Sequence, residues 1–360
     1  MVDWSNFMII LVIVSVLIAF ILQRFLLQFT LKNIHYKSAL SKDMIEQDEE
    51  FDIVSEVHND KWLPVMYIEL VERLPAKAKK KTDAHSLYKF FMLPRQKIEI
   101  RTTISLPSRG RYLLEGGTLH GGDFWGSETA YERKRIWEEV VVIPPKANSL
   151  RLDNLLGGFL GDISVHRFIM PDPVLFIGVR EYTGREPQKD ISWAHSLRAR
   201  KLMVKQYDHT LELAVTVILN LQTEQSNNEK DIEQCFSITR SVCEELERRK
   251  IKYSFITNAQ LVGANGRGND LRDGLGSSHL RAILESLGRA AYLWRDSYNK
   301  LMQKAIRRAE QGRYHILINP EPIKATELSS INRLKTITGA EVIMLTPENV
   351  SVRMREGEAS

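Results

Sequence analysis

One short segment of this chain combines side chains that could attack a substrate. Gly276-Ser277-Ser278-His279 places two hydroxyls beside an imidazole, the groups that a serine hydrolase uses as nucleophile and base. A helical apolar stripe begins at Leu280, and a serine in front of a helix is typical of an N-cap. The nine histidines lack metal-ligand spacing. We therefore expect Ser277 or Ser278 to be an N-cap and predict no enzyme, with a serine hydrolase using His279 as an alternative.

Polar side chains follow two of the strands that the sequence predicts. Leu211 to Leu219 is a near-continuous apolar run, typical of a strand buried on both faces, and Asn220-Leu221-Gln222-Thr223-Glu224 comes next. Asn319 follows a second such strand, Tyr314 to Ile318. Ligands of open α/β sheets bind in the crevice beyond the carboxyl ends of the strands. We expect Asn220, Gln222, Thr223 and Asn319 to line this crevice, with Asn220 and Asn319 hydrogen bonded to each other.

The second half of the chain alternates predicted strands and helices. Apolar residues recur at helical spacing from Ile232 to Leu246, after a capping-box spacing at Ser226 to Glu229. Further strands are expected at Tyr253 to Thr257 and at Glu341 to Leu345, and Thr326 is expected to cap a helix that Gly339 ends. This alternation predicts βαβ crossovers and a mostly parallel sheet.

The preceding part has the period of antiparallel strands. Ile98 to Leu106 alternates apolar and polar side chains, as a half-buried strand does. Phe51 to Val57 alternates similarly, and Val140 to Ile143 precedes two prolines. Gly116-Gly117 and other glycine-rich segments are expected to form turns. Several short strands joined by such turns predict a β-sandwich-like domain.

The N-terminus has the length and apolarity of a membrane span. Phe7 to Leu22 contains no charged residue, and Trp4 to Gln23 would form about 30 Å of helix. Asp3 replaces the basic start of a cleaved signal peptide, so we expect a retained anchor. Arg24, Lys32, Lys37 and Lys42 follow the span and no basic residue precedes it. The positive-inside rule then predicts a single-pass protein of the cell membrane with its C-terminal bulk in the cytoplasm.

Composition narrows the possible partners. The 50 basic and 45 acidic residues leave a net charge of only +5, without the concentrated basic element of a nucleic-acid binder. Cys235 and Cys243 lie eight residues apart on one predicted helix, about 12 Å, too far for a disulfide. Free thiols suit a reducing compartment. We predict no nucleic-acid partner.

A segment rich in arginine and aromatic residues precedes the α/β half. Its elements are Arg180, Tyr182, Ile191, Trp193, Arg198 and Lys205, with Leu202 and Val204 among them. Together with Arg109-Gly110-Arg111-Tyr112 and Asp123-Phe124-Trp125-Gly126, this order resembles the DUF58 family, over roughly residues 45 to 320. The chain departs from the family pattern at Arg185-Glu186, which replaces Gly-Asp. We interpret the segment as a connector held by ion pairs and the Trp193 indole, or alternatively as a phosphate- or protein-docking patch.

The resemblance implies a von Willebrand A-like domain, a class that often binds a divalent cation through an Asp-x-Ser-x-Ser loop. Asn220 replaces the first Asp of that loop, Gln222 and Glu224 replace the serines, and Asn319 replaces a later Asp. Mg²⁺ normally requires at least one carboxylate. Because both anchoring carboxylates are amides here, we predict a degenerate metal loop, no metal and no cofactor.

Taken together, the sequence predicts an α+β multidomain protein with an N-terminal transmembrane helix, a β-sandwich-like domain and a von Willebrand A-like α/β domain. The expected boundaries are 1–30 for the anchor, 31–44 for a juxtamembrane linker, 45–150 for the β domain, 151–207 for the connector and 208–360 for the α/β domain.

The resemblance also implies a function. It implies a bacterial membrane-anchored interaction module working with a MoxR-type AAA+ ATPase, and in some cases with a transglutaminase-like membrane protein, in assembly or maturation of a client complex. A metal-dependent adhesion module facing outward is the other alternative, besides the hydrolase.

Overall fold

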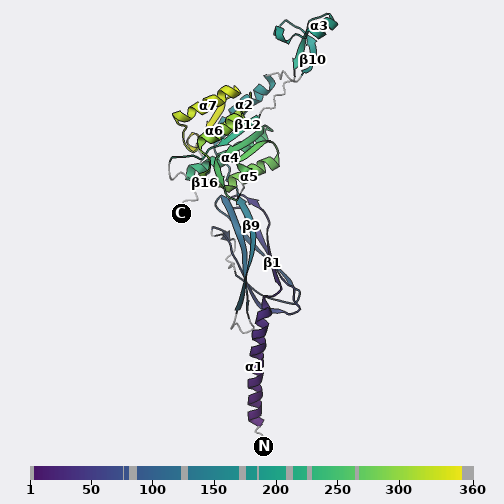
Figure 1. Ribbon diagram of the computed structural model, residues 1–360, viewed down its shortest axis with the longest axis vertical. Helices are drawn as coiled ribbons and strands as arrows, with labels where there is room; N and C mark the ends of the chain where they lie inside the picture. Colours follow the sequence, from purple (N-terminus) through teal and green to yellow (C-terminus); the bar gives the residue numbers. More distant parts are fainter. Residues whose placement is uncertain are drawn as a thin grey trace. The chain divides into compact units, whose positions relative to one another are not determined.

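The computed structural model describes residues 4–75, 77–80, 87–122, 129–169, 176–184, 186–207, 214–224, 229–263 and 267–350. The chain divides into two compact units, Met1–Ile143 and Pro144–Ser360. The first is β-rich, and the second contains a mostly parallel sheet with helices (Figure 1). The predicted α+β multidomain class is therefore confirmed at this level.

Two sheets form the first unit, after helix α1 (Trp4–Thr30). The first sheet has, in order, strands β1 (Ile34–Leu40), β3 (Glu50–Asn59), β7 (Lys97–Ser105) and β5 (Lys79–Lys80). The second has, in order, strands β2 (Met44–Ile45), β9 (Thr129–Val142), β8 (Gly110–Gly122), β4 (Val65–Glu72) and β6 (Leu87–Met92). Every pair is antiparallel except β2 with β9.

The two sheets share one apolar interior. β3 and β7 alternate buried and more exposed side chains, as predicted, because one face of each strand is covered. Val57 of the first sheet packs in one cluster with Ile68 and Leu119 of the second. Phe51 and Val140 meet in a second such cluster. Residues from both sheets thus build a common core.

Two predictions for this unit are wrong. The expected linker at 31–44 contains strand β1, whose seven residues pair with β3. The expected turn at Gly116-Gly117 lies inside β8, where the register shifts between Leu114 and Gly116. Gly116 has a φ of 82°, and a Cβ there would lie 2.9 Å from the backbone nitrogen of Ile136. Glycine is needed here because the strand bulges rather than because the chain reverses.

A five-stranded sheet organises the second unit. Its order is β15 (Asp270–Gly274), β13 (Lys252–Thr257), β12 (Ala214–Leu219), β17 (Tyr314–Ile318) and β18 (Val342–Leu345). Only the edge strand β15 is antiparallel. In chain order these are the third, second, first, fourth and fifth strands of the sheet. This is a doubly wound order, whose direction reverses between β12 and β17.

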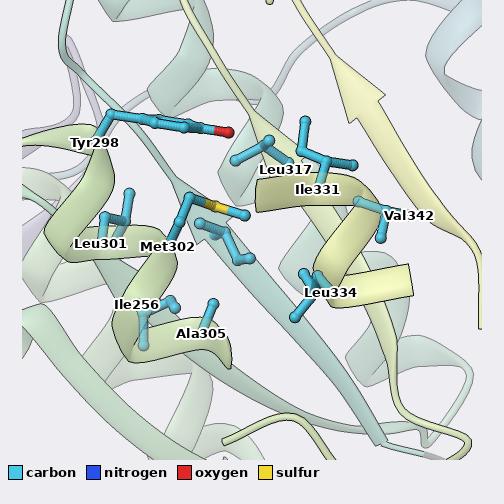
Figure 2. Packing of buried hydrophobic residues seen from close by; sticks show 10 residues of the cluster. Ile256, Tyr298, Leu301, Met302, Ala305, Leu317, Ile331, Leu334 and Val342 are labelled. Atoms are coloured by element: carbon cyan, nitrogen blue, oxygen red, sulfur yellow. The ribbon is translucent and has the colours of Figure 1, made fainter. Parts of the chain in front are cut away.

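Helices cover both faces of this sheet. The helices are α2 (Leu150–Ile169), α4 (Glu229–Arg248), α5 (Ser277–Arg289), α6 (Tyr298–Arg307), α7 (Ala325–Thr338) and α8 (Pro347–Val350). Leu301 of α6 and Leu334 of α7 pack on Ile256 and Leu317 of the sheet (Figure 2). Tyr253 lies three residues before Ile256 on β13, so its side chain points to the opposite face of the sheet. There it contacts His279 of α5 and Glu247 of α4.

The described helix ends correct two predicted caps. Gly276, not Ser277 or Ser278, is the N-cap of α5. Lys324, not Thr326, is the N-cap of α7, where its backbone N–H donates to the Glu327 carboxylate at 3.3 Å. Gly339 ends α7 with a φ of 63°, as predicted. The predicted cap at Ser226 lies outside the described residues.

Smaller elements complete the second unit. Strands β14 (Ala259–Leu261) and β16 (Ala290–Trp294) pair beside the 3-10 turn at Arg267–Asn269. The arginine-rich segment forms a hairpin of β10 (Phe176–Glu181) and β11 (Met203–Tyr207), with a 3-10 turn at Gln188–Asp190 and helix α3 (Trp193–Ala199) between them.

Helix α1 is the long N-terminal helix (Figure 1), and the apolar side chains from Phe7 to Ile21 are exposed. Within the part of the chain that the structure describes, no helix satisfies both the length and the apolarity required to cross a membrane.

Candidate binding cleft at the carboxyl ends of β12 and β17

A cleft of about 270 Å³ lies where the strand order reverses. Asn220, Gln222, Thr223 and Asn319, the four residues predicted to form the crevice, all line it. The other lining residues are Glu224, Ser297, Tyr298, Asn299, Glu321, Pro322, Lys324 and Glu327. The cleft is thus bordered by the ends of two internal strands and by the first turns of α6 and α7.

The Asn220 amide is committed within the protein. Its Oδ1 accepts hydrogen bonds from the Asn258 Nδ2 at 2.7 Å and from the Gln222 backbone N–H at 3.1 Å. Its Nδ2 donates to the Gln222 carbonyl at 3.5 Å. Asn258 in turn accepts from the Leu221 backbone N–H at 2.8 Å. This network fixes the loop after β12 against the end of β13.

Asn319 is held differently from the prediction. We expected it to bond Asn220, but Asn220 bonds Asn258 on the opposite side of β12. The Asn319 side chain is only 3% exposed, and its Oδ1 has no hydrogen-bond partner among the described residues. A buried acceptor without a donor is destabilising by about 1–3 kcal/mol. The Asn319 Oδ1 is therefore an unpaired acceptor that the surrounding protein encloses.

Gln222 and Thr223 stabilise the walls of the cleft. The Gln222 Oε1 accepts a hydrogen bond from the Tyr298 backbone N–H at 2.6 Å. Because Ser297 makes no side-chain cap bond, Gln222 supplies the acceptor that the first turn of α6 needs. Tyr298 also packs its ring into the core below (Figure 2). On the other wall, the Thr223 hydroxyl donates to the Glu321 carboxylate.

The rim is mainly acidic. Glu224, Glu321 and Glu327 contribute three carboxylates, and Lys324 contributes the rim's ammonium group. Lys324 forms an ion pair with Glu224, and this hydrogen bond raises the pKa of the lysine above its usual value. Glu327 accepts from the Lys324 backbone N–H. The acidic groups therefore outnumber the basic one.

The donor set of the cleft does not fit a bound Mg²⁺ ion. Within the described ranges, no group of three or more His, Cys, Asp or Glu residues is placed to hold a metal. Asn220 and Glu224, at two of the loop positions that correspond to cation ligands, interact with other residues of the protein. Asn220 bonds Asn258, and Glu224 pairs with Lys324. A hard cation would need several oxygen ligands converging in near-octahedral geometry.

The arginine-rich segment is held mainly by its own hairpin. Arg180 pairs with Glu186 at 2.6 Å, and hydrogen bonds from Thr183 together with this arginine lower the pKa of Glu186 to about 2. The Tyr182 backbone N–H donates to the Leu202 carbonyl at 2.8 Å. Lys205 pairs with Val179 in the β10–β11 ladder, and Ile191 is buried beside Val204.

Trp193 does not hold this segment together. It lies on α3 with 64% of its surface exposed, and Leu197, four residues later on the same helix, is 81% exposed. Arg198, another predicted element of the segment, is exposed on the same helix. The expectation that the indole fixes the connector is wrong, because most of the residue's surface is exposed.

The serines and the histidine of the alternative hydrolase site lie at the start of α5. Ser277 and Ser278 are exposed on the first turn of α5. The His279 Nε2 is 2.9 Å from the Tyr253 carbonyl, and its ring packs edge-on against the Tyr253 ring at 4.8 Å. The Nδ1 lies against Gly274, where a Cβ would come within 2.5 Å of it. His279 therefore braces β13 and β15.

Asn258, Glu321, Lys324 and Glu327 were not predicted to belong to this cleft. A signal for Asn258 exists in the sequence, because an asparagine directly follows each of three parallel strands, at 220, 258 and 319. Side chains that leave parallel strands at their carboxyl ends meet at one edge of the sheet. Glu321 and Lys324 come from the loop before α7 and Glu327 from its first turn, and no sequence pattern placed these residues near Thr223.

No protein-family model matches this chain, and no curated protein matches it. Among solved structures, it is similar to the CARDB domain of a Pyrococcus furiosus protein in complex with di-metal ions, at 8% identity over 31% of this chain and 90% of that one, with a TM-score of 0.20. It is also similar to Escherichia coli alpha-2-macroglobulin from domain MG7 to the C-terminus, at 13% identity over 34% of this chain and 20% of that one, with a TM-score of 0.23.

A third similar structure is Pseudomonas fluorescens alkylpurine DNA glycosylase AlkC bound to DNA containing an abasic site analog. The identity is 10% over 31% of this chain and 30% of that one, and the TM-score is 0.20. Likenesses at this level assign no function to this chain.

Proposed function

We propose that this chain is a membrane-anchored protein-interaction module of the DUF58 type, with a β-sandwich-like domain and a von Willebrand A-like domain. In this proposal the cleft at β12 and β17 binds a protein partner without a bridging metal ion. The observation that carries it is the Asn220 amide, whose oxygen and nitrogen are both engaged inside the protein. The doubly wound strand order supports the domain assignment.

The anchor is proposed from the sequence of the whole of α1. Arg24 is the only charged residue among its 27 residues. Exposed apolar side chains from Phe7 to Ile21 would be covered by lipid in such an arrangement. The basic residues after the span favour a cytoplasmic location for the rest of the chain.

The partner is proposed from the resemblance, which implies a MoxR-type AAA+ ATPase and possibly a transglutaminase-like membrane protein. The chain would then hold an assembly or maturation complex at the bilayer. The exposed Trp193 and Leu197 of the arginine-rich hairpin offer a second contact surface for such a complex. Aromatic and arginine side chains are enriched at protein interfaces.

The proposal is tested by purifying the tagged full-length protein from membranes in mild detergent and identifying what is retained. We expect an AAA+ ATPase in stoichiometric amount with the wild type. Glu224→Arg, which reverses the charge of a cleft rim residue, should reduce its recovery severalfold. Glu341→Arg, at the amino end of β18, makes the same charge change away from the cleft and should leave recovery unchanged. Background-level ATPase with the wild type would contradict the proposal.

A further inference from the structure

Large apolar side chains gather on one part of the surface of the first unit. Between residues 31 and 143, eight large apolar side chains of the described chain are exposed. Five of the eight belong to the β3–β4 and β6–β7 loops and to the strand ends beside them. We call these five the apolar patch: Trp62, Leu63, Met66, Phe91 and Leu93. Exposed patches of this kind mark surfaces that bind another protein or a membrane.

Hydrogen bonds hold the members of the apolar patch close to one another. The Asn59 Nδ2 donates to the carbonyl of Leu63 at 3.0 Å and to the carbonyl of Leu93 at 2.9 Å. β4 pairs with β6 directly beside Met66 and Phe91. The two loops and the two strand ends therefore form one continuous surface.

The end of α1 borders the apolar patch. The Lys61 Nζ donates a hydrogen bond to the Thr30 carbonyl, at the last residue of α1. The Asp60 backbone N–H donates to the Asn33 carbonyl at 3.1 Å. Asp60 and Lys61 immediately precede Trp62 in the chain. The loop that carries the patch is therefore bonded to the segment through which α1 enters this unit.

The proposed anchor places this loop at the surface of a bilayer. With Trp4 to Gln23 across the hydrocarbon core, Thr30 lies seven residues further along α1, about 10 Å beyond the core. The headgroup region occupies about 5–8 Å on each side of the core. Long side chains beside Thr30 are thus within reach of the headgroups.

The chain around the apolar patch is basic. Residues 30–33, 60–66 and 91–97 contain four basic side chains and one acidic side chain, Asp60. The Arg95 guanidinium lies 5.6 Å from the centre of the Trp62 ring. Tryptophan together with arginine and lysine is typical of residues at a membrane interface, and anionic headgroups attract such a basic segment.

We propose that the apolar patch inserts into the headgroup region of an anionic bilayer beside α1, as a second membrane contact of this protein. Trp62 and Leu63 would enter first, because their loop is the one bonded to the end of α1. The basic side chains around them would contact lipid phosphates. This inference rests on the proposed function, because α1 must anchor the chain for the patch to reach the lipid in this way.

The test measures the surroundings of a label on the patch in the full-length protein. The protein is placed in nanodiscs of phosphatidylcholine and phosphatidylglycerol. Leu63→Cys is labelled with a nitrobenzoxadiazole fluorophore, since both native thiols are buried. Two quenchers are compared, a doxyl group on the lipid acyl chain and aqueous iodide. We expect the doxyl lipid to quench this label and iodide to quench it weakly.

A matched label controls for position within the same unit. Trp137→Cys lies on β9, exposed in the wild type but eight residues from Thr129, about 27 Å along the strand. Gly121 and Gly122, at the end of β8 that pairs with Thr129, include the residue that adjoins Thr30. The label at position 137 should be quenched by iodide and not by the doxyl lipid.

A double variant tests whether the apolar side chains cause the insertion. Trp62→Ser combined with Phe91→Ser, in the Leu63→Cys protein, should reduce quenching by the doxyl lipid about twofold or more, because apolar burial drives interfacial binding. Trp137→Ser combined with Leu113→Ser removes exposed apolar side chains elsewhere and should leave the quenching unchanged. Circular dichroism verifies that each variant is folded, and the two labels in the otherwise native chain carry the test if the double variants are not.

Three outcomes would overturn this inference. In the first, the label at position 63 is quenched by iodide as strongly as the label at position 137. In the second, it is shielded from both quenchers, which would mean that a second copy of the chain covers the patch. In the third, the serine variant is folded and its quenching by the doxyl lipid is unchanged.

Alkaline carbonate extraction of cell membranes tests the anchor separately. A chain that resists extraction while its label at position 63 stays open to iodide would keep the anchor and reject the second contact. A chain that carbonate releases, with a label that the doxyl lipid still quenches, would reject the anchor and keep the lipid-binding patch.

Discussion

His315 is a fully buried imidazole on the internal strand β17. Neither ring nitrogen has a hydrogen-bond partner within the described residues. Burial, followed by the positive charge of Arg313, lowers the pKa of His315 to about 4. Arg313 itself is held by Asp273, through two hydrogen bonds of 2.8 and 2.7 Å. The structure thus keeps this imidazole neutral beside a fixed cation.

This arrangement predicts a loss of stability in mild acid. Between pH 6.5 and about 4, the unfolded chain binds a proton at residue 315 that the folded chain does not. The free energy of unfolding therefore falls as pH falls through this window, by up to about 3 kcal/mol at about 1.4 kcal/mol per pKa unit. Urea unfolding at several pH values measures the slope, and His315→Leu should make it shallower. An identical slope in this variant would contradict the assignment.

Several elements of the first unit meet at one buried carboxylate. Glu72 on β4 accepts hydrogen bonds from Ser55 of β3 at 2.5 Å and from Thr102 of β7 at 2.7 Å. Tyr36 and Tyr88 bond these two hydroxyls in turn, at 3.1 and 2.7 Å. Because Glu72 belongs to one sheet and both donors belong to the other, the network joins the two sheets across their apolar core.

Removal of the Glu72 carboxylate should weaken the packing of the two sheets against each other. Glu72→Ala leaves the Ser55 and Thr102 hydroxyls without their charged acceptor and opens a cavity, so we expect a loss of about 3 kcal/mol. Glu99→Ala, on an exposed position of β7, should change stability by less than about 0.5 kcal/mol. Chemical denaturation followed by circular dichroism compares the two. Equal effects would show that the network is not stabilising.

The four parallel strands of the α/β unit were predictable because each is a local apolar run. Tyr314–Ile318 was predicted with its observed bounds, and Lys252–Thr257 within one residue. Strand β1 escaped prediction because Ile34–Leu40 is recognised as a strand only through its pairing with β3, which is distant in sequence. Gly116 was misassigned for a related reason, since a bulge depends on the neighbouring strand.

The same limit applies to the cleft. Four lining residues were predictable because side chains that follow parallel strands meet at one edge. Their hydrogen bonds were not, because the partner of Asn220 depends on strand order, and β13 rather than β17 supplies it. The caps of α5 and α7 were each misplaced by one or two residues, since glycine and lysine gave no side-chain signal.

At the scale of the whole molecule, the proposed membrane anchor depends on α1. Its exposed apolar side chains from Phe7 to Ile21 would be unfavourable in water. The Thr30 carbonyl, at its end, accepts a hydrogen bond from Lys61 of the first unit. Burial lowers the pKa of Lys61 to about 8. The hydrogen bond between Lys61 and Thr30 joins the end of α1 to the strands that follow it.

The proposed anchor predicts a specific effect of charge. Ile13→Lys combined with Leu17→Lys places two ammonium groups in the middle of α1, each unfavourable by about 3 kcal/mol at the centre of a bilayer. Most of the protein should then leave the membrane fraction on alkaline carbonate extraction, whereas the wild type should stay. Ile13→Leu combined with Leu17→Ile keeps the apolarity and should behave as the wild type. Release of the wild type would count against an anchor.

Cys235 and Cys243 are both buried in α4, and burial raises the pKa of each thiol well above its usual value. Thiolates are the species that react with maleimides and oxidants. The two thiols of the folded chain should therefore not react with such reagents at neutral pH. A cysteine introduced on the rim, for example at Glu224, could therefore carry a fluorophore or spin label in the otherwise native protein, and report directly on what enters there.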